Sequence, residues 1–485
     1  MNINENGALA YESSGDARVD YFSKIVRNSS KEEITTLLEK CWKLSPDDTM
    51  KLIFQKRDCR GGNGEKEIFY ISLIWVWVYH SKSFLKNIHH IPEYGSYKDW
   101  CKLVEKDHSL RFLIGKEFAK QLKIDLKCID THNTSLCAKY APSEKHEYDS
   151  KIPGFLNIIT KEFSENVCCR KDYRKALTKL RSKIKIVETQ MCENDWENID
   201  YSKVPSRATY LYKTAFRKHN PEKYQEWLDK VMNKESKVNA SQLQPHEIAG
   251  HYLNKMYDND GFVEDQLVEA QWRQLLDDLS EECDFRNCVA MPDMSGSMCG
   301  LPMNVSATLG ILVAKVAAKQ GSKFGDLLIT FSDQPSFLDL SKYDKLVDNV
   351  KTLAHGCSNG FNTDLYKAFA IIIEKSIEKN VATSEFPEKI IIFTDMQFDE
   401  AVEDLTIMDS LDDLFDKSPY KRPQIVCWNL RNVSNVCATS SHDDVALVSG
   451  FSKDMFKNIM NNVITTPYDV MRNTIDNPRY DIITS

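Results

Sequence analysis

The sequence lacks the features by which exported and membrane-spanning chains are recognised. Residues 1–15 are polar and small, with neither a basic stretch nor an apolar core, so they are unlike a secretory signal. The most apolar run, residues 68–79, is about a dozen residues long, whereas a membrane span needs ~20. We therefore expect no membrane association and a buried helix over this run.

Cysteine pairs at metal-binding spacing are also missing. The 14 cysteines are scattered, with no C-x-x-C pair and no Cys/His cluster of the zinc type. In a chain of 485 residues, scattered thiols are typical of a reducing compartment, where most of them fill the core. These absences predict a soluble protein of the cytoplasm or another reducing intracellular compartment. If the chain is viral, the virion is a further location.

The chain has no excess of positive charge. Its net charge is −8, which disfavours wholesale attraction to nucleic acid or to anionic membranes. The acidic excess lies after residue 280, where the charge is roughly −10, while the preceding part is near neutral or slightly basic. Any contact with RNA is therefore expected in the first part of the chain.

Helical patterns fill residues 30–280, where strand-like alternation is scarce. Ser30 begins a capping box ahead of apolar residues at helical spacing, and Ser45, followed by proline, is a typical helix start. The Gly-rich segment 61–64 lacks the spacing of a phosphate-binding loop and follows helical sequence, so we interpret it as a turn between helices.

The pattern changes near residue 281, after which short apolar stretches alternate with helical ones. The stretch 389–393 is continuously apolar, as buried parallel strands are. Further strands are expected at 288–291, 327–331, 424–428 and 445–447. We therefore expect a flexible N-terminus (1–28), an all-helical, repeat-like (HEAT-like) domain (29–280) and a Rossmann-like α/β domain with a doubly wound parallel sheet (281–485).

Hard oxygen groups follow the predicted strands where those strands end. Asp293, Ser295 and Ser297 form a D-x-S-x-S pattern after the first strand. Asp395 follows the continuously apolar strand, and Thr363 lies at a loop-to-helix junction between them. Because ligands gather at the carboxyl ends of parallel strands, we expect these five side chains to form one metal site. Hydroxyl and carboxylate oxygens favour Mg²⁺, or else Mn²⁺ or Ca²⁺, over zinc or copper.

This pattern resembles the metal-ion-dependent adhesion site of von Willebrand factor A (vWA) domains. The five positions match in residue type, order and loop context over about 200 residues. The resemblance implies a binding role, in which the ion keeps an open coordination position for a carboxylate of an acidic protein partner. The alternative is that Ser295 and Ser297 cap a helix and that Asp395 is a turn residue.

The first half of the chain carries a second resemblance. Residues 57–66 and 91–99 look like the helical-repeat module of the Ro (TROVE) ribonucleoprotein family, whose members join a helical ring to a vWA domain. Residues 138–143, 173–175 and 199–206 resemble an uncharacterised TROVE-like family of plants, fungi and large DNA viruses. The resemblance covers nearly the whole chain, and it implies architecture directly but function only by analogy.

Basic residues crowd the stretch 170–185 and predict an RNA-binding surface. They are Arg170, Lys171, Arg174, Lys175, Lys179, Arg181, Lys183 and Lys185, and a second basic group lies at Arg207, Lys213, Arg217 and Lys218. Tyr173, Tyr201, Tyr210 and Tyr212 are interleaved. Basic side chains release counterions from phosphates, and aromatic rings stack on unpaired bases. The Ro resemblance implies structured RNA as the ligand. The alternative is a solvated helix face whose charges pair with Glu and Asp.

Two catalytic patterns are weaker alternatives. Residues 356–360 spell the G-x-S-x-G of a nucleophile elbow, with His442 downstream, but no strong strand precedes them. A haloacid-dehalogenase phosphatase needs a second carboxylate two residues after its strand-end Asp, where Ser295 stands. We therefore expect no enzyme but a scaffold that binds RNA and an acidic partner. A protein adaptor without RNA is the alternative, and a hydrolase with Ser358 as nucleophile is the remote one.

Overall fold

The computed structural model divides into two compact units, each built from segments far apart in sequence. It describes the chain except for residues 5, 132–133, 165–168, 185, 241, 256–262, 331–334, 357–363, 401, 403–404 and 433–434. Met1–Cys41 and Asp200–Asn477 form one unit, called here the α/β unit, and Trp42–Ile199 and Pro478–Ser485 form the other, the helical unit. The units therefore do not follow the single boundary expected between residues 280 and 281, because the helices after Asp200 group with the sheet.

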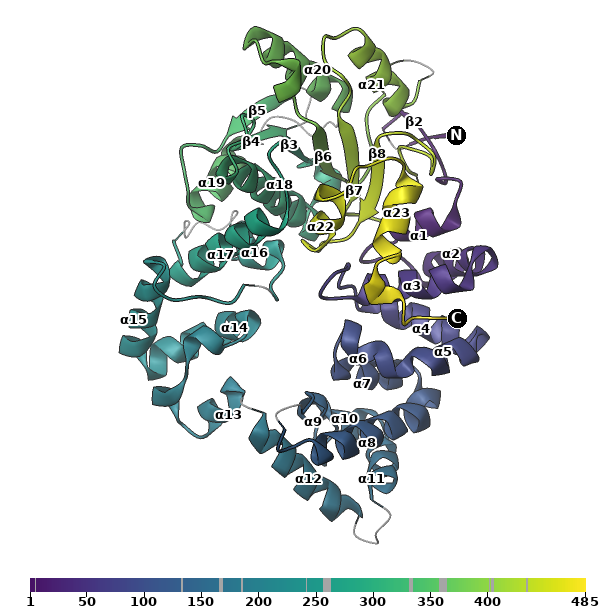
Figure 1. Ribbon diagram of the computed structural model, residues 1–485, viewed down its shortest axis with the longest axis vertical. Coiled ribbons are helices and arrows are strands. Elements are labelled where there is room, and N and C mark those ends of the chain that lie inside the picture. The colour runs from purple at the N-terminus through teal and green to yellow at the C-terminus, as the bar shows by residue number, and fades with distance from the viewer. Residues whose placement is uncertain are drawn as a thin grey trace. The chain divides into compact units, whose positions relative to one another are not determined.

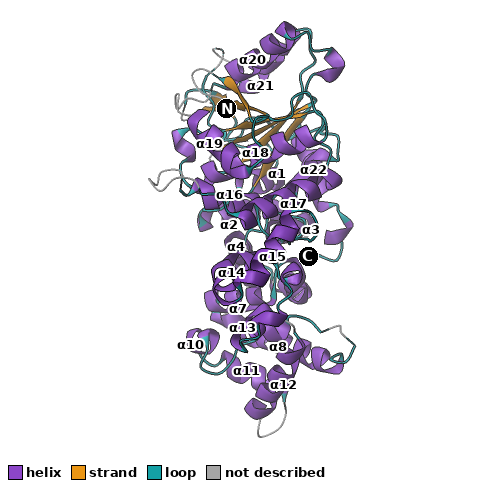
Figure 2. Cartoon of the chain, turned by 90° about the vertical axis from the view of Figure 1, so that its left-hand side faces the viewer, coloured by secondary structure: helices purple, strands orange, loops and turns teal. Residues whose placement is uncertain are grey.

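The predicted fold class is confirmed: a helical region precedes an α/β arrangement. Up to Glu282 the regular structure of the described residues is helical, apart from the short ribbon of β1 (Asn2–Ile3) and β2 (Leu9–Ala10). The main sheet then begins with β3 (Cys288–Pro292). Figure 2 shows the strands gathered together among helices near the upper end of that view.

The helical unit is built from helices that are 4 to 17 residues long. They are α3 (Pro46–Arg57), α4 (Glu67–Tyr79), α5 (Ser81–Asn87), α6 (Ile91–Tyr94), α7 (Tyr97–Lys106), α8 (Arg111–Lys127), α9 (Cys137–Tyr140), α10 (Glu147–Lys151), α11 (Phe155–Phe163), α12 (Cys169–Lys183) and α13 (Val187–Cys192). As predicted, the Ser45 side chain caps α3 by accepting a hydrogen bond from the Asp48 amide. Most of α4 up to Val76 is buried, whereas Val78 and Tyr79 at its end are exposed.

The Gly-rich segment after α3 is the turn that the sequence predicts. The Gly62 amide donates to the Asp58 carbonyl (3.2 Å), and the Asn63 amide donates to the Gln55 carbonyl (3.1 Å). A Cβ atom on Gly62 would lie 2.1 Å from the Gln55 carbonyl oxygen. Only glycine fits at this position, because any side chain would collide with backbone.

The α/β unit holds a six-stranded sheet in the order β5-β4-β3-β6-β7-β8. The strands after β3 are β4 (Leu327–Thr330), β5 (Ser336–Asp339), β6 (Lys389–Thr394), β7 (Gln424–Asn429) and β8 (Val445–Ser449). All neighbours are parallel except β4 and β5. The sheet is therefore mixed, not wholly parallel as expected. The antiparallel edge strand β5 was not predicted, because this strand is only four residues long and half-buried, which leaves a weak sequence pattern.

Helices cover both faces of this sheet (Figure 1). The helices of the unit are α1 (Ala17–Lys24), α2 (Lys31–Leu44) as far as Cys41, α14 (Ser206–His219), α15 (Pro221–Met232), α16 (Pro245–Leu253), α17 (Gln266–Glu282), α18 (Leu301–Lys319), α19 (Leu346–Gly356), α20 (Leu365–Glu378), α21 (Ile407–Asp416), α22 (Met455–Met460) and α23 (Pro467–Ile475). One face packs on α20 and α21 through a core that includes Val289, Ile390 and Phe369. This two-sided burial explains why the central strands are continuously apolar.

Helix α18 packs closely on the other face of the sheet. A Cβ on Gly310 would lie 3.0 Å from the Pro292 ring, so a glycine at this point lets the helix approach β3. Within the described part of the chain, α18 is the one helix whose length and composition would allow it to cross a membrane. However, 72% of its apolar window is buried inside the unit, as expected for the central helix of a domain core.

Residues 1–28, for which the sequence predicted a flexible segment, instead form β1, β2 and α1. The Asn4 side chain donates to the Phe398 carbonyl (2.8 Å), and the Tyr11 amide donates to the Val436 carbonyl (3.0 Å). On α1, Val19 and Phe22 are buried. Because many of these contacts are made by backbone groups, the polar composition of the segment does not reveal them.

Candidate metal-binding site

Parallel pairing brings two of the predicted acidic residues to one edge of the sheet. Pro292 at the end of β3 is in register with Phe393 of β6, so the residues that follow both strands lie at the same carboxyl edge. The Asp293 amide donates to the Phe393 carbonyl (2.8 Å), and the Thr394 hydroxyl donates to Asp293 Oδ2 (2.9 Å). The structure therefore brings Asp293 and Asp395 into neighbouring loops, as the sequence predicts.

The D-x-S-x-S segment folds into a tight turn stabilised by its own side chains. The Ser295 amide donates to Asp293 Oδ1 (2.9 Å), and the hydroxyl oxygens of Ser295 and Ser297 are 2.9 Å apart. Ser295 is buried, whereas Ser297 is exposed, so the hydroxyl pair extends from the interior to the surface. Thr363, the fifth residue of the predicted site, lies outside the described residues.

A basic residue that sequence reasoning missed lies beside this turn. Arg431 follows β7 by two residues, and its Nη1 lies 4.0 Å from Asp395 Oδ2 and donates to the Ser297 carbonyl. β7 is parallel to β6, so its end lies at the same edge of the sheet. The sequence contained one signal for Arg431, which is its position two residues beyond a predicted strand of the parallel sheet.

The carboxyl groups of the site are strongly desolvated. Asp293 is fully buried and Asp395 is 1% exposed. Burial, together with the negative charge of Asp395, raises the pKa of Asp293 to about 6, although hydrogen bonds from Ser295 and Thr394 act in the opposite direction. A cation near Asp293 would offset the negative charge of Asp395 and would favour the ionised form of Asp293.

The donor groups fit a hard divalent cation. Adjacent oxygens around an octahedral ion at 2.0–2.1 Å lie about 2.8–3.0 Å apart. The Ser295 and Ser297 hydroxyls have this separation, 2.9 Å, which is also that of a hydrogen bond. No group of three or more His, Cys, Asp or Glu side chains with metal-binding geometry occurs among the residues that the structure describes. The chemistry is therefore that of hydroxyl and carboxylate oxygens, which suits Mg²⁺ better than zinc.

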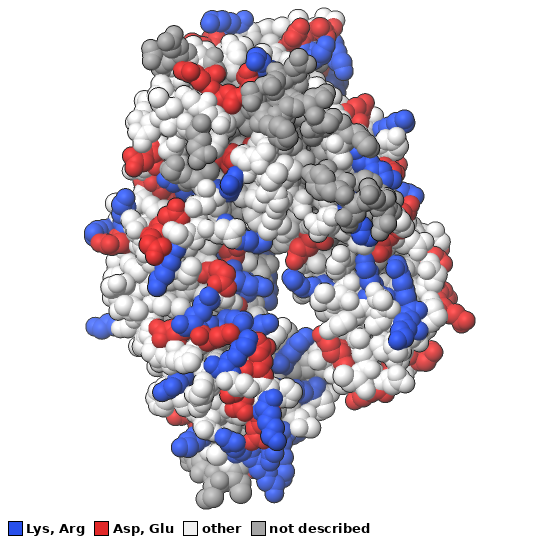
Figure 3. Space-filling view, turned by 180° about the vertical axis from the view of Figure 1, so that it is seen from behind, with Lys and Arg blue, Asp and Glu red and all other residues white. Residues whose placement is uncertain are grey.

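The predicted RNA-binding residues lie on α12, in the helical unit. The side chains of Arg170, Lys171, Arg174, Lys175, Lys179 and Lys183 are exposed. Several of them line one open hollow, together with Thr178 and Ser182. Lys and Arg side chains also gather at the lower end of the face shown in Figure 3, and Figure 1 places α12 at the lower end of its view. Arg170 and Arg174 both lie near Glu144, at 3.4 and 3.2 Å, which neutralises part of the charge.

Two residues of this set point into the protein, not toward solvent. Arg181 donates from Nε to the Ala138 carbonyl (2.8 Å) and from Nη2 to the Ala141 carbonyl (3.0 Å). Tyr173 is buried and donates to the Pro142 carbonyl (2.7 Å), so it cannot stack on a base. Together they connect α12 to α9 and to the residues that follow it. Lys185 lies outside the described residues.

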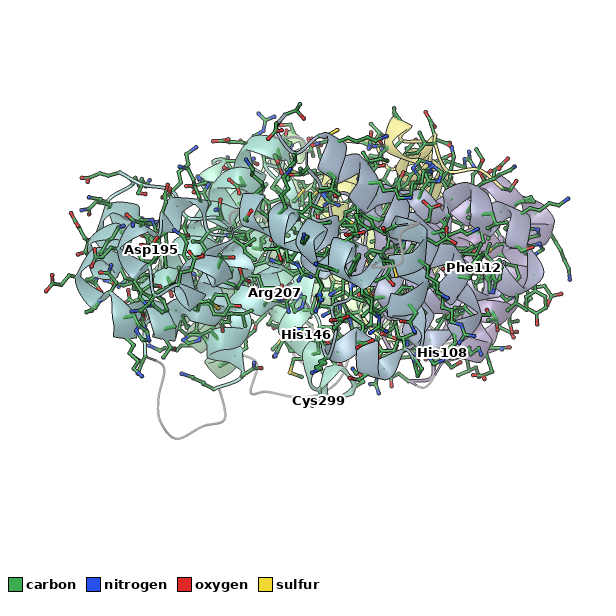
Figure 4. All side chains as sticks on the ribbon, turned by 90° about the horizontal axis from the view of Figure 1, so that it is seen from below. His108, Phe112, His146, Asp195, Arg207 and Cys299 are labelled. Atoms are coloured by element: carbon green, nitrogen blue, oxygen red, sulfur yellow. The ribbon has the colours of Figure 1, made fainter. Side chains whose placement is uncertain are left out.

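The second basic group lies in the α/β unit and is largely neutralised. Arg207, labelled in Figure 4, pairs with Glu247 at 3.1 Å. Lys213 and Arg217 both pair with Asp265, at 2.9 and 3.5 Å. These pairs correspond to the alternative in which basic residues balance nearby acidic side chains.

The segments 57–66 and 91–99 meet in a buried polar network of the helical unit. Arg57 pairs with Asp99 at 2.8 Å, and both side chains are at most 3% exposed. The Tyr70 hydroxyl also donates to Asp99, at 2.5 Å. Asp99 is therefore the partner of Arg57, and this buried pair has a structural role.

The nucleophile-elbow alternative is not tested by the structure. Ser358 lies outside the described residues, so its distance to His442 is undefined. His442 is half-buried, and burial together with the nearby Arg422 lowers its pKa. The hydrolase interpretation stays a prediction.

Two families of unknown function match successive parts of this chain. The family described as Domain of unknown function (DUF2828) matches residues 4–105 and 93–285, and the family described as Domain of unknown function (DUF7788) matches residues 287–477. The two matches meet where the helices give way to the sheet. The chain belongs to the DUF2828 family, with a C-terminal part of the DUF7788 type. It is 31% identical to "Uncharacterized protein L728" of Acanthamoeba polyphaga mimivirus, over 98% of this chain and 87% of that protein.

Proposed function

We propose that this protein is a non-catalytic scaffold whose α/β unit binds an acidic protein partner through a divalent cation, Mg²⁺ or else Mn²⁺ or Ca²⁺. The Ser295 and Ser297 hydroxyls hold the ion, and Asp293 and Asp395 supply the balancing charge. Thr363, on the undescribed segment, is the fifth ligand that the sequence predicts. The observation that supports the proposal is that two buried carboxylates lie at the carboxyl edge of the sheet, where the Ser295 and Ser297 hydroxyl oxygens are 2.9 Å apart.

The resemblance to the vWA adhesion site supports a binding role for this arrangement. With neutral hydroxyls as direct ligands, a bound divalent ion keeps much of its positive charge and attracts a carboxylate from outside. Ser297 is exposed, so such a carboxylate can approach from the solvent side. A protein that captures acidic side chains in this way needs no general acid or base.

Metal titration of the intact chain tests the proposal. Isothermal titration with MnCl₂ is expected to show one saturable site that Asp293→Ala abolishes while the thermal unfolding transition is retained. Asp443→Asn is the matched control, because it removes an exposed carboxylate of the same unit and leaves the site intact. Equal Mn²⁺ affinity in wild type and Asp293→Ala would rule out the site.

A second proposed function, RNA binding by the helical unit, is favoured by the exposed basic face of α12. Lys171, Lys175 and Lys179 line the same open hollow and face solvent. The resemblance to the Ro family supports structured RNA as the ligand. The alternative is an adaptor that uses this surface for an acidic protein and binds no RNA. If the protein is viral, like the mimivirus relative, the cytoplasm of the infected cell and the virion are both candidate locations.

A further inference from the structure

Arg431 is the one cationic side chain that pairs with the carboxylates of the site, among the residues that the structure describes. Its Nη1 lies 4.0 Å from Asp395 Oδ2, and it also donates to the Ser297 carbonyl. The Asp395 side chain is 2% exposed, whereas that of Arg431 is 49% exposed. One end of this pair is therefore fixed in the interior, and the other lies at the surface.

The backbone that carries Arg431 is held by hydrogen bonds within the fold, whereas its side chain is half exposed. The Leu430 amide donates to the Thr394 carbonyl (3.0 Å), and the Arg431 amide donates to Asn429 Oδ1 (3.1 Å). Asn429 in turn donates to the Ser23 carbonyl (3.0 Å). A half-exposed arginine on an anchored loop can exchange between a position over the site and one in solvent without moving the fold.

The charges of the site create a conflict between Arg431 and a metal ion. Two ionised carboxylates carry two negative charges, and Arg431 compensates one of them. A divalent ion held by Ser295 and Ser297 would lie beside the same Asp395 carboxylate and close to the guanidinium. Two cations at this spacing, next to a poorly solvated carboxylate pair, repel each other appreciably.

We propose that Arg431 is a built-in competitor of the divalent ion and that it sets the metal affinity of the site. Without metal, its guanidinium is the counter-ion of Asp395. When the ion binds, the side chain turns outward into solvent, and the ion replaces it at the carboxylate. The inference rests on the proposed metal site and adds to it the residue that regulates occupancy.

Titration of MnCl₂ into neutral variants of Arg431 tests this competition. Arg431→Gln and Arg431→Met are expected to bind Mn²⁺ about three- to tenfold more tightly than wild type, because one repelling charge is gone. Arg431→Lys, which keeps the charge, is expected to stay within about twofold of wild type. Lys421→Gln is the matched control, since Lys421 also lies 4.0 Å from a carboxylate, that of Asp444, but is 89% exposed.

The outcomes separate this inference from the proposed metal site. Tighter binding in the neutral variants, lost again when Asp293→Asn is added, supports both. Mn²⁺ binding that appears only in the neutral variants also supports both, because Arg431 then blocks the site fully. Equal or weaker binding in the neutral variants overturns the role of Arg431 and leaves the metal site standing. No Mn²⁺ binding in any variant overturns both.

Discussion

The Thr394 hydroxyl, at the end of β6, donates a 2.9 Å hydrogen bond to Asp293 Oδ2, at the end of β3. The other carboxylate oxygen of Asp293 accepts from the Ser295 amide at 2.9 Å. Both oxygens of a fully buried carboxyl group are thus oriented by neighbours, one from the adjacent strand and one from its own turn. The register of two parallel strands therefore assembles the candidate site, and its acidic groups have well-defined positions before any ligand arrives.

The first prediction concerns the pH dependence of stability when metal is removed. Asp293 has a folded-state pKa of about 6, raised from 3.8. Its stabilising effect is therefore present in full below the unfolded-state pKa and is lost as the pH rises through the folded-state value. In EDTA, Asp293→Asn should gain about 2–3 kcal/mol of unfolding free energy relative to wild type between pH 4 and pH 7.

Urea denaturation at several pH values measures this difference. Asp443→Asn, at an exposed position, serves as the control and should show no such trend. Saturating Mg²⁺ should reverse the order at pH 7, because the bound ion stabilises the ionised carboxylate of wild type. A difference between Asp293→Asn and wild type that does not change with pH would contradict the assignment of Asp293 as a strongly desolvated acid.

The second prediction concerns acid destabilisation through His246. This side chain is 8% exposed and lies against Phe451, and burial together with nearby Arg27 lowers its pKa to about 3. A depressed histidine pKa gives stability that is present above the unfolded-state value and is lost as the pH falls toward 3. Wild type should lose about 2 kcal/mol through this group between pH 7 and pH 5, and His246→Gln should lose less over that interval. The exposed residue His108 provides the control variant, His108→Gln. If the unfolding free energy of His246→Gln depends on pH as steeply as that of wild type, His246 is not the source of the acid destabilisation.

The third prediction contrasts two glycines of the turn between α3 and α4. A Cβ on Gly62 would lie 2.1 Å from a backbone oxygen, whereas Gly64, with φ +71°, has open space around it. Gly62→Ala should therefore cost about 3 kcal/mol or more, or prevent folding. Gly64→Ala should cost only about 1 kcal/mol, from its left-handed backbone. Thermal unfolding of the two variants compares them directly, and equal losses would show that the turn relaxes around the new methyl group.

The fourth prediction concerns RNA binding by α12. Replacing Lys171, Lys175 and Lys179 together by alanine should weaken binding to a structured RNA and reduce the salt dependence of the affinity, since three phosphate contacts are lost. The control set is Lys116, Lys120 and Lys123, which are exposed on α8 of the same unit. Filter binding at two salt concentrations measures both sets. Equal losses of RNA affinity in the two triple variants would indicate nonspecific electrostatic attraction in place of a site on α12. Absence of RNA binding by wild type would favour the protein-adaptor alternative.

Locally encoded features were predictable from the sequence. The caps at Ser30 and Ser45 depend on neighbouring residues, and both are present as expected. The strand ending at Thr394 was predictable because burial on both faces leaves a continuous apolar run. Strand ends in turn located Asp293 and Asp395, since parallel strands place their following loops at one edge.

Features that depend on tertiary contacts were not predictable in the same way. In the sequence, Arg181 is indistinguishable from the other basic residues of its helix. In the structure, its guanidinium donates to the backbone carbonyls of Ala138 and Ala141. Arg431 carries no local motif and reaches Asp395 only because β6 and β7 are neighbours. The N-terminal strands escaped notice because they are very short and many of their contacts are backbone hydrogen bonds, which residue types do not reveal.

We expect a divalent cation to bind between the Ser295 and Ser297 hydroxyls and the buried carboxylates. The most direct test is an anomalous difference map from crystals of the intact chain grown with MnCl₂. One strong peak is expected about 2.1–2.2 Å from both hydroxyl oxygens, and it should be absent from Asp293→Ala crystals. A map without a peak at this edge of the sheet, or with Mn²⁺ held by other side chains, would contradict this expectation.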